Sequence, residues 1–139
     1  QKMTDLCKEK GVKLVLIKAP TEYPYWYEQW DEQVQQFADE NGVDYINFIP
    51  LQNDIGLDMS QDTYDAGLHM NTTGAEKMAD YFGQYLVENY NLTDYRNDSR
   101  YASIWDEKEA AYDSMKQQQY DELNKYGELK SFGANAIQN

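Results

Sequence analysis

His69 is the only histidine in a chain of 139 residues, and its neighbours are residue types that catalytic sites use. Asp65 precedes it by four positions, and Asn71 and Gly74 follow it. An aspartate can accept a hydrogen bond from one imidazole nitrogen and so fix the tautomer, which leaves the other nitrogen free to take a proton from a nucleophile. By spacing alone, a surface histidine beside an aspartate that caps a turn is the more common arrangement. The residue types therefore permit general-base catalysis without requiring it.

The segment around His69 also carries a series of aspartates: Asp54, Asp58, Asp62 and Asp65. Such a series could suggest calcium, but it lacks the ligand order and the terminal glutamate of an EF-hand loop. Cys7 is the only cysteine, which excludes a disulfide within the chain and a cysteine-based metal site. We therefore expect no metal and no other cofactor.

Two aliphatic segments are expected to form parallel strands joined by a helix. Residues 12–17 form a nearly continuous aliphatic run after a helix end at Gly11, and residues 43–49 form a second run. Between them, apolar residues at helical spacing predict a helix over residues 24–41 that ends at Asn41-Gly42. Strand, crossover helix and strand make a right-handed βαβ unit. Trp26 and Trp30 belong to the helical stripe, so core packing is their simplest role, although a tryptophan near a loop edge could contact a sugar.

The elements after the second strand place His69 at a loop edge. Residues 51–71 are predicted to form a long polar loop, a length that is usually functional or disordered. A helix over residues 73–89 follows, and Thr73-Gly74-Ala75-Glu76 fits a capping box with Thr73 at the cap. Open α/β sheets place their active sites at such carboxyl-terminal strand edges. Residues 91–104 are polar, and a second helix over 105–126 has a thin apolar stripe, so we expect it on the surface or against a partner.

Asp65, His69, Asn71 and Gly74 resemble the last block of the SGNH/GDSL hydrolases, in which Asp-x-x-His is followed by a small polar residue and a glycine. The order of the flanking strands and helices is similar to the C-terminal half of that fold. Segments 90–96 and 101–105 resemble tails found on a group of such proteins in Gram-positive bacteria. The resemblance covers residues 10–105 approximately.

The resemblance implies an α/β three-layer parallel-sheet SGNH (flavodoxin-like) fold, of which this chain is the C-terminal portion only. Residues 1–91 would form the C-terminal half of an SGNH hydrolase-like domain. Residues 92–139 would form a C-terminal extension with a surface helix. The resemblance also implies a secreted or cell-surface protein of a Gram-positive bacterium.

The family resemblance assigns roles to two residues. His69 would be the general base of a Ser-His-Asp triad, and Asp65 would be its orienting acid. Asp65 lies four residues before His69, whereas the family spacing is three, so Asp62 is the alternative carboxylate. The family's nucleophile lies in a Gly-Asp-Ser motif, and none of the five serines of this chain has that context. We therefore expect the nucleophile in an upstream segment and no activity in this chain alone.

The expected activity is that of a serine esterase or acyl hydrolase, with carbohydrate O-acyl esters as a substrate suggested by family analogy. The partners would be the upstream nucleophile-bearing segment and a small ester or acylated carbohydrate. Two alternatives stay open: an O-acyltransferase acting on cell-wall or exopolysaccharide hydroxyls, and a non-catalytic binding module on the same fold. The upstream sequence would distinguish the binding module from an enzyme, because loss of the serine in the Gly-Asp-Ser block would favour the binding module.

Charge and hydropathy restrict the classes of partner that remain. The formal net charge is −13, from 12 basic and 25 acidic side chains. Such a surface repels phosphate backbones, so we expect no nucleic-acid partner. No apolar run in the sequence approaches the length of a membrane span.

Overall fold

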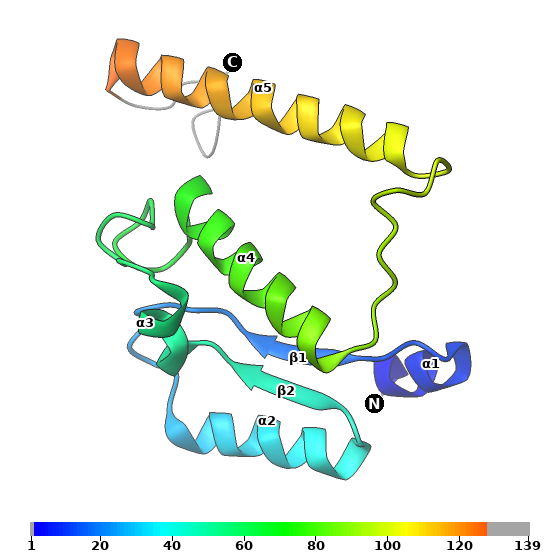
Figure 1. Cartoon of the computed structure of the whole chain (residues 1–139). Coiled ribbons are helices and arrows are strands. Elements are labelled where there is room, and N and C mark those ends of the chain that lie inside the picture. The colour runs from blue at the N-terminus through cyan, green and yellow to red at the C-terminus, as the bar shows by residue number, and fades with distance from the viewer. Residues whose placement is uncertain (1, 128–139) are drawn as a thin grey trace. The chain divides into compact units, whose positions relative to one another are not determined.

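A computed structural model describes residues 2–127 of the chain. The chain divides into two compact units, Gln1–Asn89 and Tyr90–Asn139. The elements, drawn in Figure 1, are α1 (Lys2–Lys10), β1 (Val15–Lys18), α2 (Glu28–Asn41), β2 (Asp44–Asn47), the 3-10 helix η1 (Ile49–Leu51), α3 (Gln52–Ile55), α4 (Thr72–Asn89) and α5 (Ala102–Tyr126). Within the described residues, no helix is both long and apolar enough to cross a membrane.

The strands β1 and β2 pair in parallel, with Val15 opposite Asp44 and Lys18 opposite Asn47. This confirms the predicted strand–helix–strand unit, with α2 as the crossover. Both strands are shorter than the aliphatic runs predicted. Before β1, the amide of Val12 donates to the Cys7 carbonyl at 2.8 Å and so completes the end of α1. Gly11 makes this turn at φ 64°, a left-handed conformation that glycine adopts without steric cost.

Side chains of β2 alternate between two helices that lie on opposite sides of the strands (Figure 1). Tyr45 and Asn47 point toward α2, where both hydrogen-bond to Asp31. Ile46 points the other way and joins the buried core with Phe48. The other members of this core are Ile55 and Met78, with partly buried Val15, Leu51, Leu57, Met70, Tyr81, Phe82 and Tyr85 around them. The core thus lies between β2 and α4.

The helix α2 begins at Glu28, four residues later than predicted, and its N-cap Tyr27 has extended backbone. Trp26 therefore precedes the helix, and Trp30 is 45% exposed. Trp26 is half-buried and Trp30 is exposed, and neither belongs to the buried core, so the core role predicted for this pair was wrong. The buried residue of α2 is the small Ala38. Trp30 instead packs edge-on against the rings of Trp26 and Tyr27, outside the core.

The segment 51–71 is more ordered than the predicted polar loop. It begins at the last residue of η1 and contains α3, and Ile55 of α3 is buried in the core. It also contains an isolated antiparallel bridge between Thr63 and Met70. The apolar residues Ile55, Leu57 and Met59 explain this order, because each is at least partly buried against the rest of the first unit.

The second unit is described by itself. Its helix α5 begins at Ala102, three residues before the predicted start, and contains no buried residue. The connecting segment holds two local ion pairs, Asp94 with Arg96 and Asp98 with Arg100.

Candidate functional site

His69 lies on a hairpin-like loop, which we call the His loop and define as residues 62–71. The bridge between Thr63 and Met70 closes its base, and the Tyr64 amide donates to the His69 carbonyl at 3.2 Å. The chain reverses at Ala66 and Gly67, whose φ angles are 58° and 90°. Consecutive positive φ values are typical of tight hairpin turns, which favour glycine. This turn brings Asp65 and His69 onto the same side.

Asp65 holds His69 by two hydrogen bonds. Its Oδ2 lies 2.5 Å from Nδ1 of the His69 ring, and its Oδ1 accepts from the His69 backbone amide at 2.6 Å. The ring hydrogen bond, with the amides of His69 and Leu68, lowers the pKa of Asp65 below its ordinary value. An ionised Asp65 accepts from Nδ1–H, so the neutral tautomer carries its lone pair on Nε2. The His69 side chain is 68% exposed, which leaves Nε2 accessible.

Tyr64 stacks on the His69 ring. The ring centroids lie 5.9 Å apart and the planes are within 14° of parallel. Tyr64 itself is highly exposed, so this pair forms an open surface and not a closed pocket. One face of the imidazole is thereby covered while its edge with Nε2 stays open.

The His loop is attached to the residues that follow β1. The buried Thr21 hydroxyl lies 3.2 Å from the Leu68 carbonyl and 3.4 Å from that of Gly67. The Glu22 amide donates to the Gly67 carbonyl at 2.8 Å. A Cβ on Gly67 would meet the Glu22 side chain at 2.8 Å, so this close approach requires glycine as much as the positive φ does. The loop is therefore positioned by the carboxyl-terminal end of β1, the edge predicted from the sequence.

Asp62, the alternative carboxylate, has a different role. Its side chain is 2% exposed, and its Oδ2 accepts from Lys77 Nζ at 2.6 Å and from the Asp58 amide at 2.8 Å. Burial raises the pKa of Asp62, but the hydrogen bonds from Lys77 and Asp58 lower it more, and the net shift is downward. The structure thus brings Asp65, and not Asp62, to the His69 ring.

The helix α4 begins directly after the His loop, and its cap differs from the prediction. Asn71 Oδ1 accepts from the Gly74 amide at 3.0 Å, and the Asn71 carbonyl accepts from Ala75. Asn71 is therefore the N-cap, and the predicted capping box with Thr73 at the cap was wrong. The cap is displaced because Asn71 also closes the His loop, through its amide to the Asp62 carbonyl at 2.9 Å. A Cβ on Gly74 would lie 2.3 Å from that same carbonyl, so the helix start requires glycine there.

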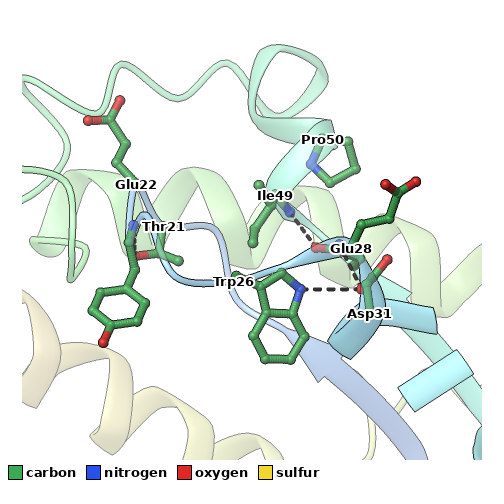
Figure 2. Close-up of a pocket in the computed structure, with 9 residues that line it drawn as sticks. Thr21, Glu22, Trp26, Glu28, Asp31, Ile49 and Pro50 are labelled. Atoms are coloured by element: carbon green, nitrogen blue, oxygen red, sulfur yellow. Dashed lines mark hydrogen bonds between the residues drawn. The ribbon is translucent and has the colours of Figure 1, made fainter. Parts of the chain in front are cut away.

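A second polar site lies at the same end of the strands. It is an open hollow of about 420 Å³, which we call the Trp26 hollow. Figure 2 shows its residues, with the Trp26 indole nitrogen directed at Asp31. The lining residues are Thr21, Glu22, Tyr23, Trp26, Glu28, Asp31, Asn47, Ile49 and Pro50. Thr21 and Glu22 also contact the His loop, so both features share one edge of the sheet.

Asp31 is the centre of the Trp26 hollow. Its Oδ1 accepts from Tyr45 OH at 2.6 Å, from Asn47 Nδ2 at 2.9 Å and from Trp26 Nε1 at 3.4 Å. Burial raises the pKa of Asp31, yet the hydrogen bonds of these three donors lower it below its ordinary value. Burial and the Asp31 carboxylate raise the pKa of Tyr45, which keeps the phenol protonated as a donor. The grouping of Asp31, Tyr45 and Asn47 was not predicted from the sequence; its signal there is the alternation that places Tyr45 and Asn47 on one face of β2.

Of the described serines, Ser60 is the one in the same unit as His69, and its hydroxyl donates to Asp58 at 2.6 Å. Ser99, Ser103 and Ser114 belong to the second unit, and Ser131 lies outside the described residues. Among residues 2–127, no three His, Cys, Asp or Glu side chains are grouped as metal ligands. The hydrogen-bonded pair of His69 and Asp65 is thus the candidate site that the first unit offers.

Comparison with protein-family models, curated proteins and solved structures finds no match to this chain.

Proposed function

We propose that this chain supplies the general base and the orienting carboxylate of a serine hydrolase that acts on ester bonds. His69 is the base, Asp65 is its orienting acid, and the serine lies in an upstream segment of the same protein. The fold proposed for the assembled domain is the three-layer SGNH type. The reaction is acyl transfer from an ester to the serine, followed by release to water.

The observation that carries this proposal is the hydrogen bond between Asp65 Oδ2 and His69 Nδ1. It selects the tautomer in which Nε2 accepts a proton, and Nε2 faces solvent on an exposed ring. The Asp65 carboxylate also stabilises the imidazolium that forms when the serine is deprotonated. A second bond, from the His69 amide to Asp65 Oδ1, fixes the carboxylate in the same turn.

The position of the pair supports the same chemistry. The His loop is attached to the end of β1 and leads directly into α4. In open α/β sheets this edge collects catalytic groups from several strands. A serine carried by a neighbouring strand of the upstream segment would reach the same edge.

The test uses the chain together with its upstream segment and a chromogenic acyl ester. His69→Ala should lower turnover by about a thousandfold or more, since the loss of the base disables the serine as well. The thermal midpoint should change little, because the His69 side chain is exposed. Tyr64→Phe, which keeps the ring stack beside His69, is the matched control and should retain activity. Turnover near the wild-type value in His69→Ala would refute the proposal.

A further inference from the structure

A chain of five aromatic rings runs beside the Trp26 hollow. In contact order they are Tyr23, Tyr25, Tyr27, Trp30 and Trp26, with centroid separations of 5.3, 6.4, 5.0 and 6.2 Å. All four contacts are edge-on, and every ring except Trp26 is among the highly exposed apolar side chains. Exposed aromatic side chains in mutual contact mark interaction surfaces, because isolated ones are normal and clustered ones are costly in water.

The charge of the hollow at the end of this chain is negative. Three carboxylates line it, those of Glu22, Glu28 and Asp31, and among the described residues no lysine or arginine does. The hydrogen bonds to Asp31 all go to Oδ1, so within the described residues Oδ2 remains able to accept from a ligand. The Lys18 Nζ lies 5.0 Å from the Trp26 ring centroid, so a cation of the chain itself contacts this indole.

The size of the hollow suits a single ring-sized group. Its volume of about 420 Å³ lies within the range of small-molecule sites. Trp26 supplies an apolar ring, while Asn47 and the carboxylates supply hydrogen-bonding groups around it. A pyranose has apolar C–H faces and polar edges, and an amino group on it adds a positive charge. Its shape and charge therefore complement the hollow, and the row of exposed rings can contact further sugar units.

We propose that the Trp26 hollow and the adjoining aromatic rings bind an amino sugar, a pyranose unit with a free ammonium group, within a glycan chain. The ammonium group pairs with Glu28 and Asp31, and the sugar ring lies against Trp26. This inference goes beyond the ester chemistry, since binding here does not require His69 to act as a base. If the proposed hydrolase is correct, the site would hold the glycan close to the His loop through the shared Thr21 and Glu22.

The test measures binding by isothermal titration at 150 mM salt to the chain together with its upstream segment, with three probes. The first is a tetramer of β-1,4-linked glucosamine, the second is its fully N-acetylated form, and the third is tetralysine. The first probe should bind at least about tenfold more tightly than each of the others. Equal affinity for the acetylated tetramer would overturn recognition of the ammonium group. Equal affinity for tetralysine would show attraction to the net negative charge alone and would overturn recognition of the sugar.

Variants locate the binding. Glu28→Gln and Trp26→Leu should each weaken binding of the glucosamine tetramer by about tenfold, since each removes one of the two complementary features. Glu40→Gln removes the same charge at the far end of α2 and should leave the affinity unchanged. Far-UV circular dichroism of each variant checks that the fold is kept. Unchanged affinity in both hollow variants, or equal loss in Glu40→Gln, or no binding of the first probe to the wild-type chain, would refute the proposal.

Discussion

At the scale of single residues, two aspartates three positions apart have unlike environments. Asp65 is half-buried and contacts the His69 ring, whereas Asp62, at the base of the His loop, is buried and accepts from Lys77. A carboxylate that orients a base must touch the base, and one that ties a loop to a helix must be enclosed by donors. In the proposed enzyme, the same chemical group would therefore orient the base at one position and stabilise the loop at the other.

The two aspartates should respond oppositely to the same substitution. Asp65→Asn should lower ester turnover of the assembled enzyme strongly, because the amide cannot hold the productive tautomer, and should change the free energy of unfolding little. Asp62→Asn should lower that free energy by about 1–2 kcal/mol, less than for a fully buried pair because Lys77 is 38% exposed. Paired kinetic and urea-unfolding measurements check this. A greater loss of turnover in Asp62→Asn would reverse the assignment.

The contribution of Asp62 should depend on pH in a definite direction. Its pKa in the folded chain is lowered from the ordinary 3.8, so folding favours the carboxylate. The stabilisation is complete above about pH 3.8 and is lost as the pH falls through the lower folded value. The difference between wild type and Asp62→Asn should thus be larger at pH 7 than at pH 3.

The turn of the His loop offers a matched pair of substitutions. Ala66 has a φ of 58°, which costs an alanine about 1–2 kcal/mol, so Ala66→Gly should be neutral or slightly stabilising after the entropy of the unfolded chain is counted. Gly67→Ala should destabilise by more than about 1 kcal/mol, because a Cβ there would also meet Glu22. Thermal unfolding of both variants checks this. Equal effects of the two changes would mean that the turn differs from the one described.

At the scale of elements, Thr21 connects β1 to the His loop. Its hydroxyl is directed at the carbonyls of Gly67 and Leu68, and it also accepts from the Tyr23 amide. Loops that carry catalytic groups need such attachment to a rigid scaffold. Thr21 therefore has a place in the proposed site although it does not touch the His69 ring.

Thr21→Val keeps the shape of the side chain and removes the hydroxyl. Hydrogen exchange of the Glu22 and Tyr64 amides, which both donate into the His loop, should become faster by about threefold to tenfold. Thr73→Val, at an exposed position in the first turn of α4, is the control and should leave both amides unchanged. Unaltered exchange in Thr21→Val would show that the backbone bonds hold the loop without the hydroxyl.

At the scale of the whole molecule, the sheet of the described residues consists of β1 and β2, so each strand has an edge without a strand partner. Ile17 of β1 is 50% exposed, and such an edge with apolar side chains invites pairing with another chain. The proposed hydrolase supplies the missing strands from its upstream segment. In that proposal one upstream segment would provide both the serine and a partner for the open strand edge.

The chain alone should self-associate, and the upstream segment should convert it to a compact, cooperative unit. The reason is that added strands would satisfy the free backbone groups and cover Ile17. Sedimentation velocity and thermal unfolding, with and without the upstream segment, measure this. A monomer with a sharp transition in the absence of that segment would show that the two strands suffice.

Some features follow from the sequence by itself. The aliphatic runs around Val15 and Ile46 predict two strands. The intervening helix makes them parallel, because it carries the chain back to the end of the sheet at which the first strand began. Gly11 and Gly42 mark the ends of α1 and α2. Their φ angles are 64° and 62°, a left-handed conformation that glycine adopts readily at helix ends. These features depend on local sterics and on hydrophobic periodicity, and both can be read from residues that are close together in the sequence.

Only the tertiary structure decided which side chains meet. The contact of Asp31 with Tyr45 and Asn47 needs α2 to pack on β2, and no local pattern encodes that packing. Asp65, and not Asp62, contacts His69 because the loop turns at two residues with positive φ angles. One of them is Ala66, a residue type that does not predict a positive φ angle. Asn71, and not Thr73, caps α4 because the same residue also closes the His loop. Polar side chains have several partners of similar energy within reach, so packing, and not propensity, selects among them.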